Sequence, residues 1–230
     1  MLATVVYLPC MKQHFDHVRD WVFDLDNTLY PPSARLFDQM EVLMTDWIVQ
    51  NIGVERHDAH DMRDGYLRDY GTTLAGLLHH HGIEPDPFLD HAHELDLSAL
   101  VPAPDLHAAI AALPGRKIVY TNGTRKHAHR VIAARGLQGL FDAVYGIEDA
   151  DYLSKPSKDA FGRVFHIGDV DTAHGAMFED SLENLEVPHA LGMRTVWIGP
   201  TAEDEPDFVD FATNDLTGFL MRVNAGLAGE

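Results

Sequence analysis

The sequence predicts an α/β fold in which a doubly wound, parallel, Rossmann-like sheet forms the core and an all-helical cap is inserted into it. From residue 105 onward, short apolar runs alternate with stretches of helical periodicity. This alternation is typical of parallel strands joined by right-handed crossovers. Polar residues directly follow several of the apolar runs. Between 33 and 101 no segment has a strand pattern, so we expect that region to be purely helical.

These patterns divide the chain into three parts. We expect residues 1–20 to be an N-terminal extension, 21–32 and 102–230 to form the catalytic core, and 33–101 to form the cap. The first nine residues are apolar, but no basic residue precedes them and no small-residue cleavage site follows. They make a poor signal peptide.

The first core strand is expected at 21–23, where an apolar run ends at a turn. Pro31 and Pro32 then break the chain direction, Ser33 can cap a helix and Gly53 can stop it. The cap helices are expected at 33–51, 55–70, 73–81 and 85–95.

The rest of the core follows a hinge at 101–104. We expect strands at 117–120, 141–145, 176–178 and 194–198. Helices are expected at 105–113, 124–135 and 157–165, with a short one from Leu216 and a frayed tail at 226–230.

Composition and charge narrow the choice of partners. The 230 residues carry a formal charge of −19, which disfavours nucleic acid and anionic membranes because such surfaces attract Lys and Arg. A small phosphorylated substrate remains compatible, since a divalent metal and one lysine can supply a local positive centre. The single cysteine, Cys10, cannot form an internal disulfide, which favours a reducing compartment and therefore a cytoplasmic location.

Polar side chains stand at the ends of three predicted strands. Asp24 and Asp26 follow the first, Thr121 and Asn122 the second, and Glu179 and Asp180 a later one; Lys155 lies in a fourth loop. Ligands of open α/β sheets bind beyond the carboxyl ends of the strands, so these residues define one candidate site. For the first strand alone, the alternative is an Asx turn with solvated acids.

Four segments resemble, in order and spacing, the motifs of the haloacid dehalogenase superfamily. They are D-L-D-N-T at 24–28, T-N-G at 121–123, K-P at 155–156 and F-E-D-S at 178–181. The long interval between the first two implies a helical cap inserted after the first strand. In this family Asp26 favours phosphoryl transfer, because a dehalogenase has no leaving oxygen to protonate and typically lacks this acid.

The resemblance also implies a role for each motif residue. Asp24 would be the nucleophile that forms an aspartyl phosphate, and Asp26 the general acid and then base. Mg²⁺ would be held by the side chains of Asp24 and Asp180 and the backbone carbonyl of Asp26, with Glu179 acting directly or through a water. The phosphoryl oxygens would be bound by four residues: Thr121, Asn122 and Gly123, the last two through their amides, and Lys155.

Longer segments resemble the pyrimidine 5′-nucleotidase group of that superfamily. They are D-L-D-N-T-L-Y-P from 24, Y-G-T-T-L-A-G-L-L at 70–78 and F-E-D-S-x-x-N-L at 178–185. This implies hydrolysis of UMP or CMP to nucleoside and phosphate. Two alternatives stay open: a phosphatase of another small metabolite, such as a sugar phosphate or a phosphoglycolate-like acid, and a non-catalytic binding module on the same fold.

Substrate selectivity is expected in the cap, because the core motifs hold only the phosphate. Tyr66, Tyr70 and Thr72 lie near a glycine-flanked break between cap helices, where an aromatic ring could stack on a base and a hydroxyl could bind a carbonyl. Packing of both tyrosines inside the cap explains them equally well. The run of histidines at 79–81 is better explained as a solvated helix end than as a zinc site.

Overall fold

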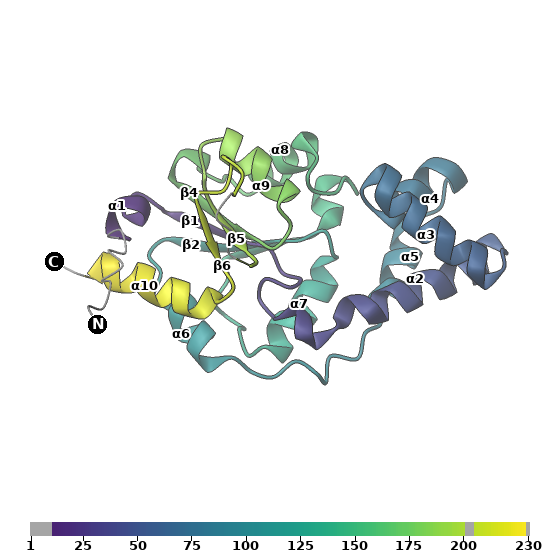
Figure 1. The fold of residues 1–230 in the computed structure, drawn as a ribbon, viewed down its shortest axis with the longest axis horizontal. Coiled ribbons are helices and arrows are strands. Elements are labelled where there is room, and N and C mark those ends of the chain that lie inside the picture. The colour runs from purple at the N-terminus through teal and green to yellow at the C-terminus, as the bar shows by residue number, and fades with distance from the viewer. Residues whose placement is uncertain (1–10, 201–204, 229–230) are drawn as a thin grey trace, which may run out of the picture.

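The computed structural model describes residues 11–200 and 205–228, and its centre is one parallel sheet. The strand order is β3-β2-β1-β4-β5-β6, and every described pairing is parallel (Figure 1). The strands are β1 Asp20–Phe23, β2 Arg116–Tyr120, β3 Ala143–Tyr145, β4 Gly175–Glu179, β5 Arg194–Ile198 and β6 Phe211–Thr213. This confirms the doubly wound core.

The strand order reverses direction at β1, which lies between β2 and β4. Phe23 at the end of β1 pairs with Val119 of β2 and with Phe178 of β4. The three central strands therefore end at nearly the same level, and the residues after them meet at one edge of the sheet. β1 and β4 are buried throughout, as expected for strands covered on both faces.

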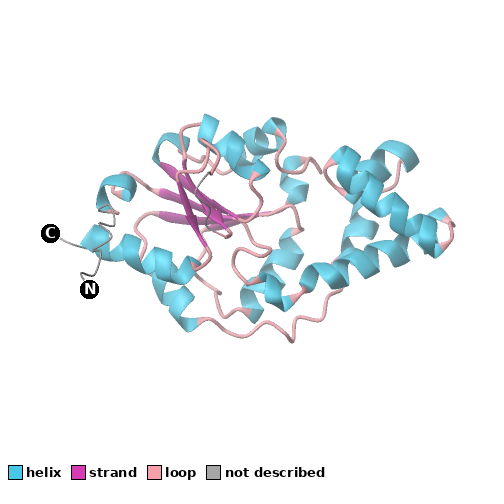
Figure 2. Cartoon of the chain, viewed as in Figure 1, coloured by secondary structure: helices cyan, strands magenta, loops and turns pink. Residues whose placement is uncertain are grey.

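Helices cover both faces of the sheet (Figure 2). One face packs against α1 Lys12–Phe15, α6 Pro104–Ala111, α7 Arg125–Ala134 and α10 Leu216–Ala228. The other packs against α8 Lys158–Ile167 and α9 Glu183–Ala190. Short 3₁₀ turns occupy Pro32–Ala34, Ile147–Ala150 and Thr172–His174.

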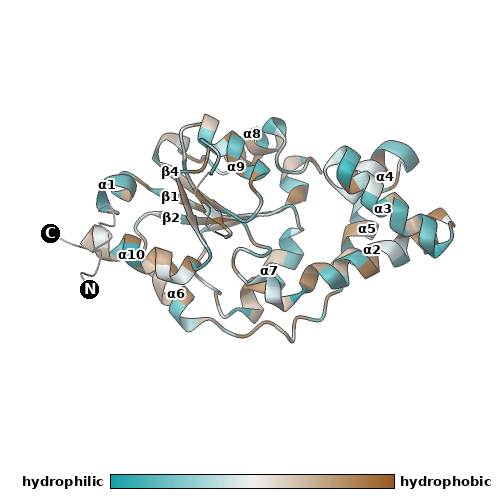
Figure 3. Cartoon of the chain, in the orientation of Figure 1, coloured by the Kyte–Doolittle hydropathy of each residue, from teal (hydrophilic) through white to brown (hydrophobic). Residues whose placement is uncertain are grey.

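The cap consists of four helices between β1 and β2: α2 Leu36–Ile52, α3 Arg56–Tyr70, α4 Thr73–His81 and α5 Pro85–Ala92. Its small core joins Trp47 and Ile48 of α2 to Leu77 of α4 and Phe88 of α5. In Figure 3 teal, hydrophilic residues dominate α3 at the outer side of the cap, whereas brown residues gather in the strands. No described helix combines the length and the apolarity needed to cross a membrane.

Two hydrogen-bonded contacts join the chain segments that connect cap and core. On the core side, Arg135 donates from Nε to the carbonyl of Leu29 at 3.1 Å and from Nη1 to the carbonyl of Val101. On the cap side, the Gln39 amide bonds the backbone of Asp96 twice, at 3.1 and 2.9 Å. The outgoing and returning segments are thus held together at both ends.

Several element boundaries differ from those predicted. The first cap helix begins at Leu36 rather than at Ser33, because Arg35 adopts a left-handed conformation after the 3₁₀ turn. The helix expected at 85–95 ends at Ala92, and residues up to Ala228 of the expected frayed tail are helical. Neither β6 nor α9 was predicted.

The N-terminal segment is also more integrated than expected. Phe15 and Val18, within the predicted extension at 1–20, are fully buried in the main core cluster. β1 begins at Asp20, whose carboxylate bonds the Arg116 guanidinium of β2 at 2.7 and 2.8 Å. The packed core therefore starts before Trp21. Residues 1–10 lie outside the described part of the chain.

Candidate active site

The three groups of polar residues predicted from strand ends lie together at one edge of the sheet. Asp24 directly follows β1, and its N–H donates to the carbonyl of Phe178 in β4. Thr121 follows β2, and its hydroxyl lies 3.4 Å from Oδ2 of Asp26. Glu179 is the last residue of β4. The parallel register is what brings together residues about a hundred and fifty positions apart.

Lys155 connects these groups at the centre of the site. Its ammonium donates to Oδ1 of Asp24 at 2.7 Å, to Oε2 of Glu179 at 2.6 Å and to the carbonyl of Tyr120 at 3.1 Å. The lysine is only 2% exposed. Burial disfavours its charge, but the two carboxylates outweigh burial and raise the pKa of Lys155 above its ordinary value. The lysine is therefore a fixed cation.

Three carboxylates surround a space that Lys155 alone cannot neutralise. Asp24, Glu179 and Asp180 each place a carboxylate oxygen within 4.8 Å of the others. Burial, followed by the negative charge of Glu179, raises the pKa of Asp24. Burial also raises the pKa of Glu179, and burial followed by the charge of Asp24 raises that of Asp180 to about 6. The cluster has an excess of negative charge.

These three residues fit a divalent cation. Oδ2 of Asp24 is buried and has no hydrogen-bond partner in the described part of the chain, an arrangement that costs free energy unless another group binds the oxygen. All three side chains offer the hard oxygen ligands that Mg²⁺ prefers. Among the described residues, this is the single cluster of acidic, histidine or cysteine side chains close enough to share an ion.

Asp26 lies in a different environment from Asp24. Its Oδ1 accepts a hydrogen bond from the Tyr30 hydroxyl at 2.7 Å and lies 2.9 Å from Nε2 of His127. Burial alone would raise the pKa of Asp26, but the charge of His127 and the two hydrogen bonds lower it to about 2. The pKa of Asp24 is therefore raised and that of Asp26 is lowered, although only one residue separates them.

The T-N-G segment supports its neighbours through specific hydrogen bonds. The side chain of Asn122 accepts from the N–H of Lys155 at 2.8 Å and donates to its carbonyl at 3.1 Å. The N–H of Gly123 donates to the Thr121 hydroxyl at 2.9 Å. A Cβ at position 123 would lie 3.0 Å from Cδ2 of His127. Glycine therefore allows the close approach of that ring.

Sequence analysis missed three residues of the site: Tyr30, His93 and His127. Tyr30 and His127 contact Asp26, and His93 at the end of α5 stacks on His127 with 4.5 Å between ring centroids. Burial lowers the pKa of His93 to about 3, so it is neutral near pH 7. With fifteen histidines in the chain, nothing in the sequence distinguished these two.

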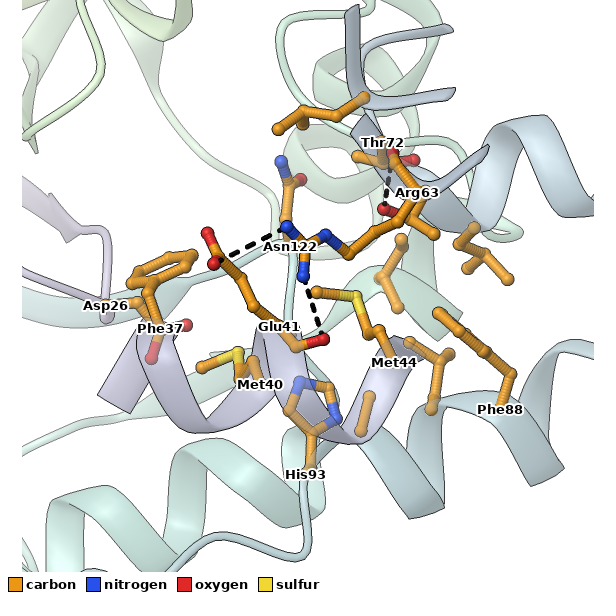
Figure 4. Close-up of a pocket in the computed structure, with 17 residues that line it drawn as sticks. Asp26, Phe37, Met40, Glu41, Met44, Arg63, Thr72, Phe88, His93 and Asn122 are labelled. Atoms are coloured by element: carbon orange, nitrogen blue, oxygen red, sulfur yellow. Dashed lines mark hydrogen bonds and ion pairs between the residues drawn. The ribbon is translucent and has the colours of Figure 1, made fainter. Parts of the chain in front are cut away.

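A cavity of about 190 Å³ opens between the cap and the strand ends (Figure 4). Asp26, Asn122 and Gly123 form its core side. Most of the cap side is apolar, with Phe37, Met40, Met44, Leu74 and Phe88. In Figure 4 Arg63 of α3 faces Glu41 of α2, with a nitrogen to oxygen distance of 3.6 Å.

The three predicted specificity residues are not grouped around this cavity. Thr72 lines it and also caps α4, accepting from the N–H of Ala75 at 3.1 Å. Tyr66 and Tyr70 do not line it; their hydroxyls lie 2.8 and 2.7 Å from the exposed His81 and His80. These histidines occupy the last turn of α4, as expected for a solvated helix end.

The parallel sheet, the helical cap and the acids at the strand ends together define a class of hydrolase. Residues 21–192 match the family of haloacid dehalogenase-like hydrolases, and the chain belongs to that family.

Individual relatives are distant. The chain is 23% identical over 188 residues to phosphate metabolism protein 8 of Saccharomyces cerevisiae, covering 74% of this chain and 58% of that protein. A HAD phosphatase from Thermococcus onnurineus is similar in structure, with a TM-score of 0.60 at 17% identity over 93% of this chain and 99% of the other. The 2-haloacid dehalogenase of Pseudomonas syringae pv. Tomato DC3000 gives 0.58 at 21% identity over 90% and 99%. At these identities the structures show a shared fold.

Proposed function

We propose that the protein is a Mg²⁺-dependent phosphatase that acts through an aspartyl phosphate. The proposal rests on the position of Asp26. This second carboxyl group lines the cavity and is held in place by two hydrogen bonds. Splitting off an alkoxide requires a proton, whereas splitting off a halide does not. A carboxyl group fixed beside the leaving group therefore favours phosphate ester hydrolysis over dehalogenation.

The reaction would proceed in two steps, transfer of the phosphoryl group to Asp24 and hydrolysis of the aspartyl phosphate. A carboxylate oxygen of Asp24 attacks phosphorus, the bond to the leaving oxygen breaks, and Asp26 gives that oxygen its proton. Water then attacks the phosphorus of the aspartyl phosphate, Asp26 takes the proton from the water, and Asp24 is released with inorganic phosphate. Negative charge of the bound phosphate favours the protonated form of Asp26 before the first step.

Positive charge around the phosphate comes from two sources in this proposal. Asp24, Asp180 and Glu179, with the backbone carbonyl of Asp26, would hold Mg²⁺, which when bound offsets the repulsion between an anionic nucleophile and an anionic substrate. Lys155 contacts Asp24 and is fixed by Asn122, so its ammonium is already oriented toward the transferring phosphoryl group. Thr121 and the amides of Asn122 and Gly123 complete this binding site.

We further propose a nucleoside 5′-monophosphate as substrate, with UMP and CMP as the first candidates. The cap side of the cavity is largely apolar, and a flat base can bury its faces there, with the exposed Phe37 available for stacking. A sugar phosphate would place several hydroxyls against Met40, Met44 and Leu74 without partners, which is unfavourable. The yeast relative is named for phosphate metabolism, which supports phosphate as the transferred group.

The test is phosphate release from a panel of nucleoside monophosphates, sugar phosphates, phosphoglycolate and haloacids, with Mg²⁺ and with EDTA. Asp24→Asn is the control that should be inactive. Asp105→Asn makes the same change at an exposed acid of α6 and should keep the activity of the wild type. We expect UMP or CMP to be cleaved fastest and EDTA to stop the reaction. Faster cleavage of a sugar phosphate would overturn the substrate assignment alone. Halide release from the haloacids, or no turnover of any compound by the folded Mg²⁺-loaded protein, would overturn the assignment as a phosphatase.

A further inference from the structure

We propose that His127 is a positioning residue for the acid and base steps. By donating its Nε2–H to Oδ1 of Asp26, it leaves Oδ2 as the oxygen that delivers and recovers the proton. This inference rests on the proposed phosphatase activity and extends it, because it assigns separate roles to the two oxygens of one carboxyl group.

The two oxygens of Asp26 have unequal surroundings. Oδ1 has two partners at short range, the Tyr30 hydroxyl at 2.7 Å and His127 Nε2 at 2.9 Å. Two donors occupy both lone pairs of a carboxyl oxygen, so Oδ1 has no free position for a proton. The described partner of Oδ2 is the Thr121 hydroxyl, at the longer distance of 3.4 Å. A proton on Asp26 therefore belongs on Oδ2.

The imidazole of His127 is held on several sides. Its backbone N–H donates to the Thr124 hydroxyl at 3.1 Å, which fixes the first turn of α7. The ring is 0% exposed, and the absence of a side chain on Gly123 allows the backbone to approach its edge. On its face lies the ring of His93, tilted by 16°. The ring can neither turn toward solvent nor exchange its partner for water.

His93 brings the cap into this arrangement. It follows α5, and its carbonyl accepts a hydrogen bond from Arg130 of α7 at 2.6 Å. The stack between His93 and His127 thus joins a cap residue to the residue that orients Asp26. Nδ1 of His127 is buried with no described partner, so Nε2 makes the polar contact of this ring.

The experiment compares two esters that differ in whether the leaving group needs a proton. Phenyl phosphate releases a phenolate whose conjugate acid, like the tyrosine side chain, has a pKa of about 10. In 2,4-dinitrophenyl phosphate the nitro groups stabilise the departing anion, so general acid catalysis contributes little. kcat and KM are measured for both esters with the Mg²⁺-loaded, full-length protein.

The variants separate orientation from packing. His127→Leu removes the donor at similar size, His127→Gln keeps a donor at the Nε2 position, and His129→Leu alters an exposed histidine of the same helix. We expect His127→Leu to lower kcat/KM, which reports only the steps up to departure of the leaving group, about 10- to 100-fold on phenyl phosphate. On the dinitrophenyl ester kcat/KM should stay within about threefold, whereas kcat should fall on both esters wherever hydrolysis of the aspartyl phosphate, which they share, limits turnover. His127→Gln should recover most of the loss, and His129→Leu should match the wild type.

Equal losses of kcat/KM on both esters, or no rescue by His127→Gln, would show that His127 only packs. If His127→Leu does not fold, His127→Asn replaces it, because its amide is placed like Nδ1 and cannot reach Asp26. Failure of the wild-type protein to cleave either ester would overturn the proposed function itself. That outcome is distinct from cleavage of both esters with uniform losses, which overturns the role of His127 alone.

Discussion

Asn122 holds the backbone of Lys155 at both of its polar groups, accepting from the N–H at 2.8 Å and donating to the carbonyl at 3.1 Å. The resemblance had implied only a backbone role for position 122, through its amide. The side chain also fixes the loop that carries the central cation. The loop after β2 and the loop before α8 are therefore joined into one unit at the strand ends.

Asn122→Ala should weaken both stability and turnover. Two hydrogen bonds are lost, so the free energy of unfolding should fall by about 1 to 3 kcal/mol, measured by chemical denaturation. Displacement of Lys155 should lower kcat/KM on the best substrate about 10- to 100-fold. Asn224→Ala is the control, since Asn224 of α10 bonds the carbonyl of Ala109 far from the strand ends. Equal activity loss in both variants would contradict the assignment.

Asp24→Asn should abolish activity without lowering the stability of the metal-free protein. Loss of the proposed nucleophile should reduce kcat by at least about a thousandfold. The same change removes one of three clustered carboxylates, whose burial and mutual repulsion raise the pKa of Asp24, so the metal-free variant should melt at a temperature no lower than that of the wild type. A variant that unfolds at a much lower temperature would mean that the Asp24–Lys155 pair is chiefly structural.

Mg²⁺ binding should strengthen as pH rises. The pKa of Asp180 is raised to about 6, and those of Asp24 and Glu179 are also raised, so the folded metal-free protein binds more protons than the unfolded chain. Its stability should therefore fall as pH rises from about 4 to 7. Mg²⁺ requires the ionised carboxylates, and the increase in melting temperature that it causes should be larger at pH 8 than at pH 5. A constant increase at both pH values would argue against binding at this cluster.

Phe37, rather than the two predicted tyrosines, should control the affinity for the leaving group. Phe37 lines the cavity and is 44% exposed, so Phe37→Ala should raise KM for the proposed nucleotide substrate about 3- to 10-fold through lost stacking. Tyr70→Ala, outside the cavity, should leave KM unchanged. A larger increase in KM for Tyr70→Ala than for Phe37→Ala would instead identify Tyr70 as a specificity residue.

The sheet and the strand-end acids could be predicted because both depend on local sequence. A parallel strand buried on both faces is a short continuous apolar run, and the polar residues after it necessarily lie at the edge of the sheet. β6 was missed because Phe211–Thr213 is only three residues long and offers a single large apolar side chain, whereas the equally short β3 contains Val144 and Tyr145. α9 was missed because Pro188 lies inside it, and proline usually ends a helical pattern.

The surroundings of Asp26 could not be predicted, because they depend on tertiary packing. His127 is about a hundred positions from Asp26, and its contact exists only because α7 packs with its first turn against the loop after β1. For the glycine-flanked break after Tyr70, a binding role and packing of the two tyrosines inside the cap explained the sequence equally well. In the structure the tyrosine hydroxyls pair with neighbouring histidines of α4 instead, which local sequence alone does not reveal.

The paired contacts at Arg135 and Gln39 restrict how the cap can travel relative to the sheet. Because the two connecting segments are fastened to each other near the core and again near the cap, one cannot lengthen while the other shortens. These contacts oppose sliding and twisting of the two segments more directly than they oppose bending of both segments about a shared axis. A cap that opened by such bending would return Phe37 and His93 to the same place in the lining of the cavity.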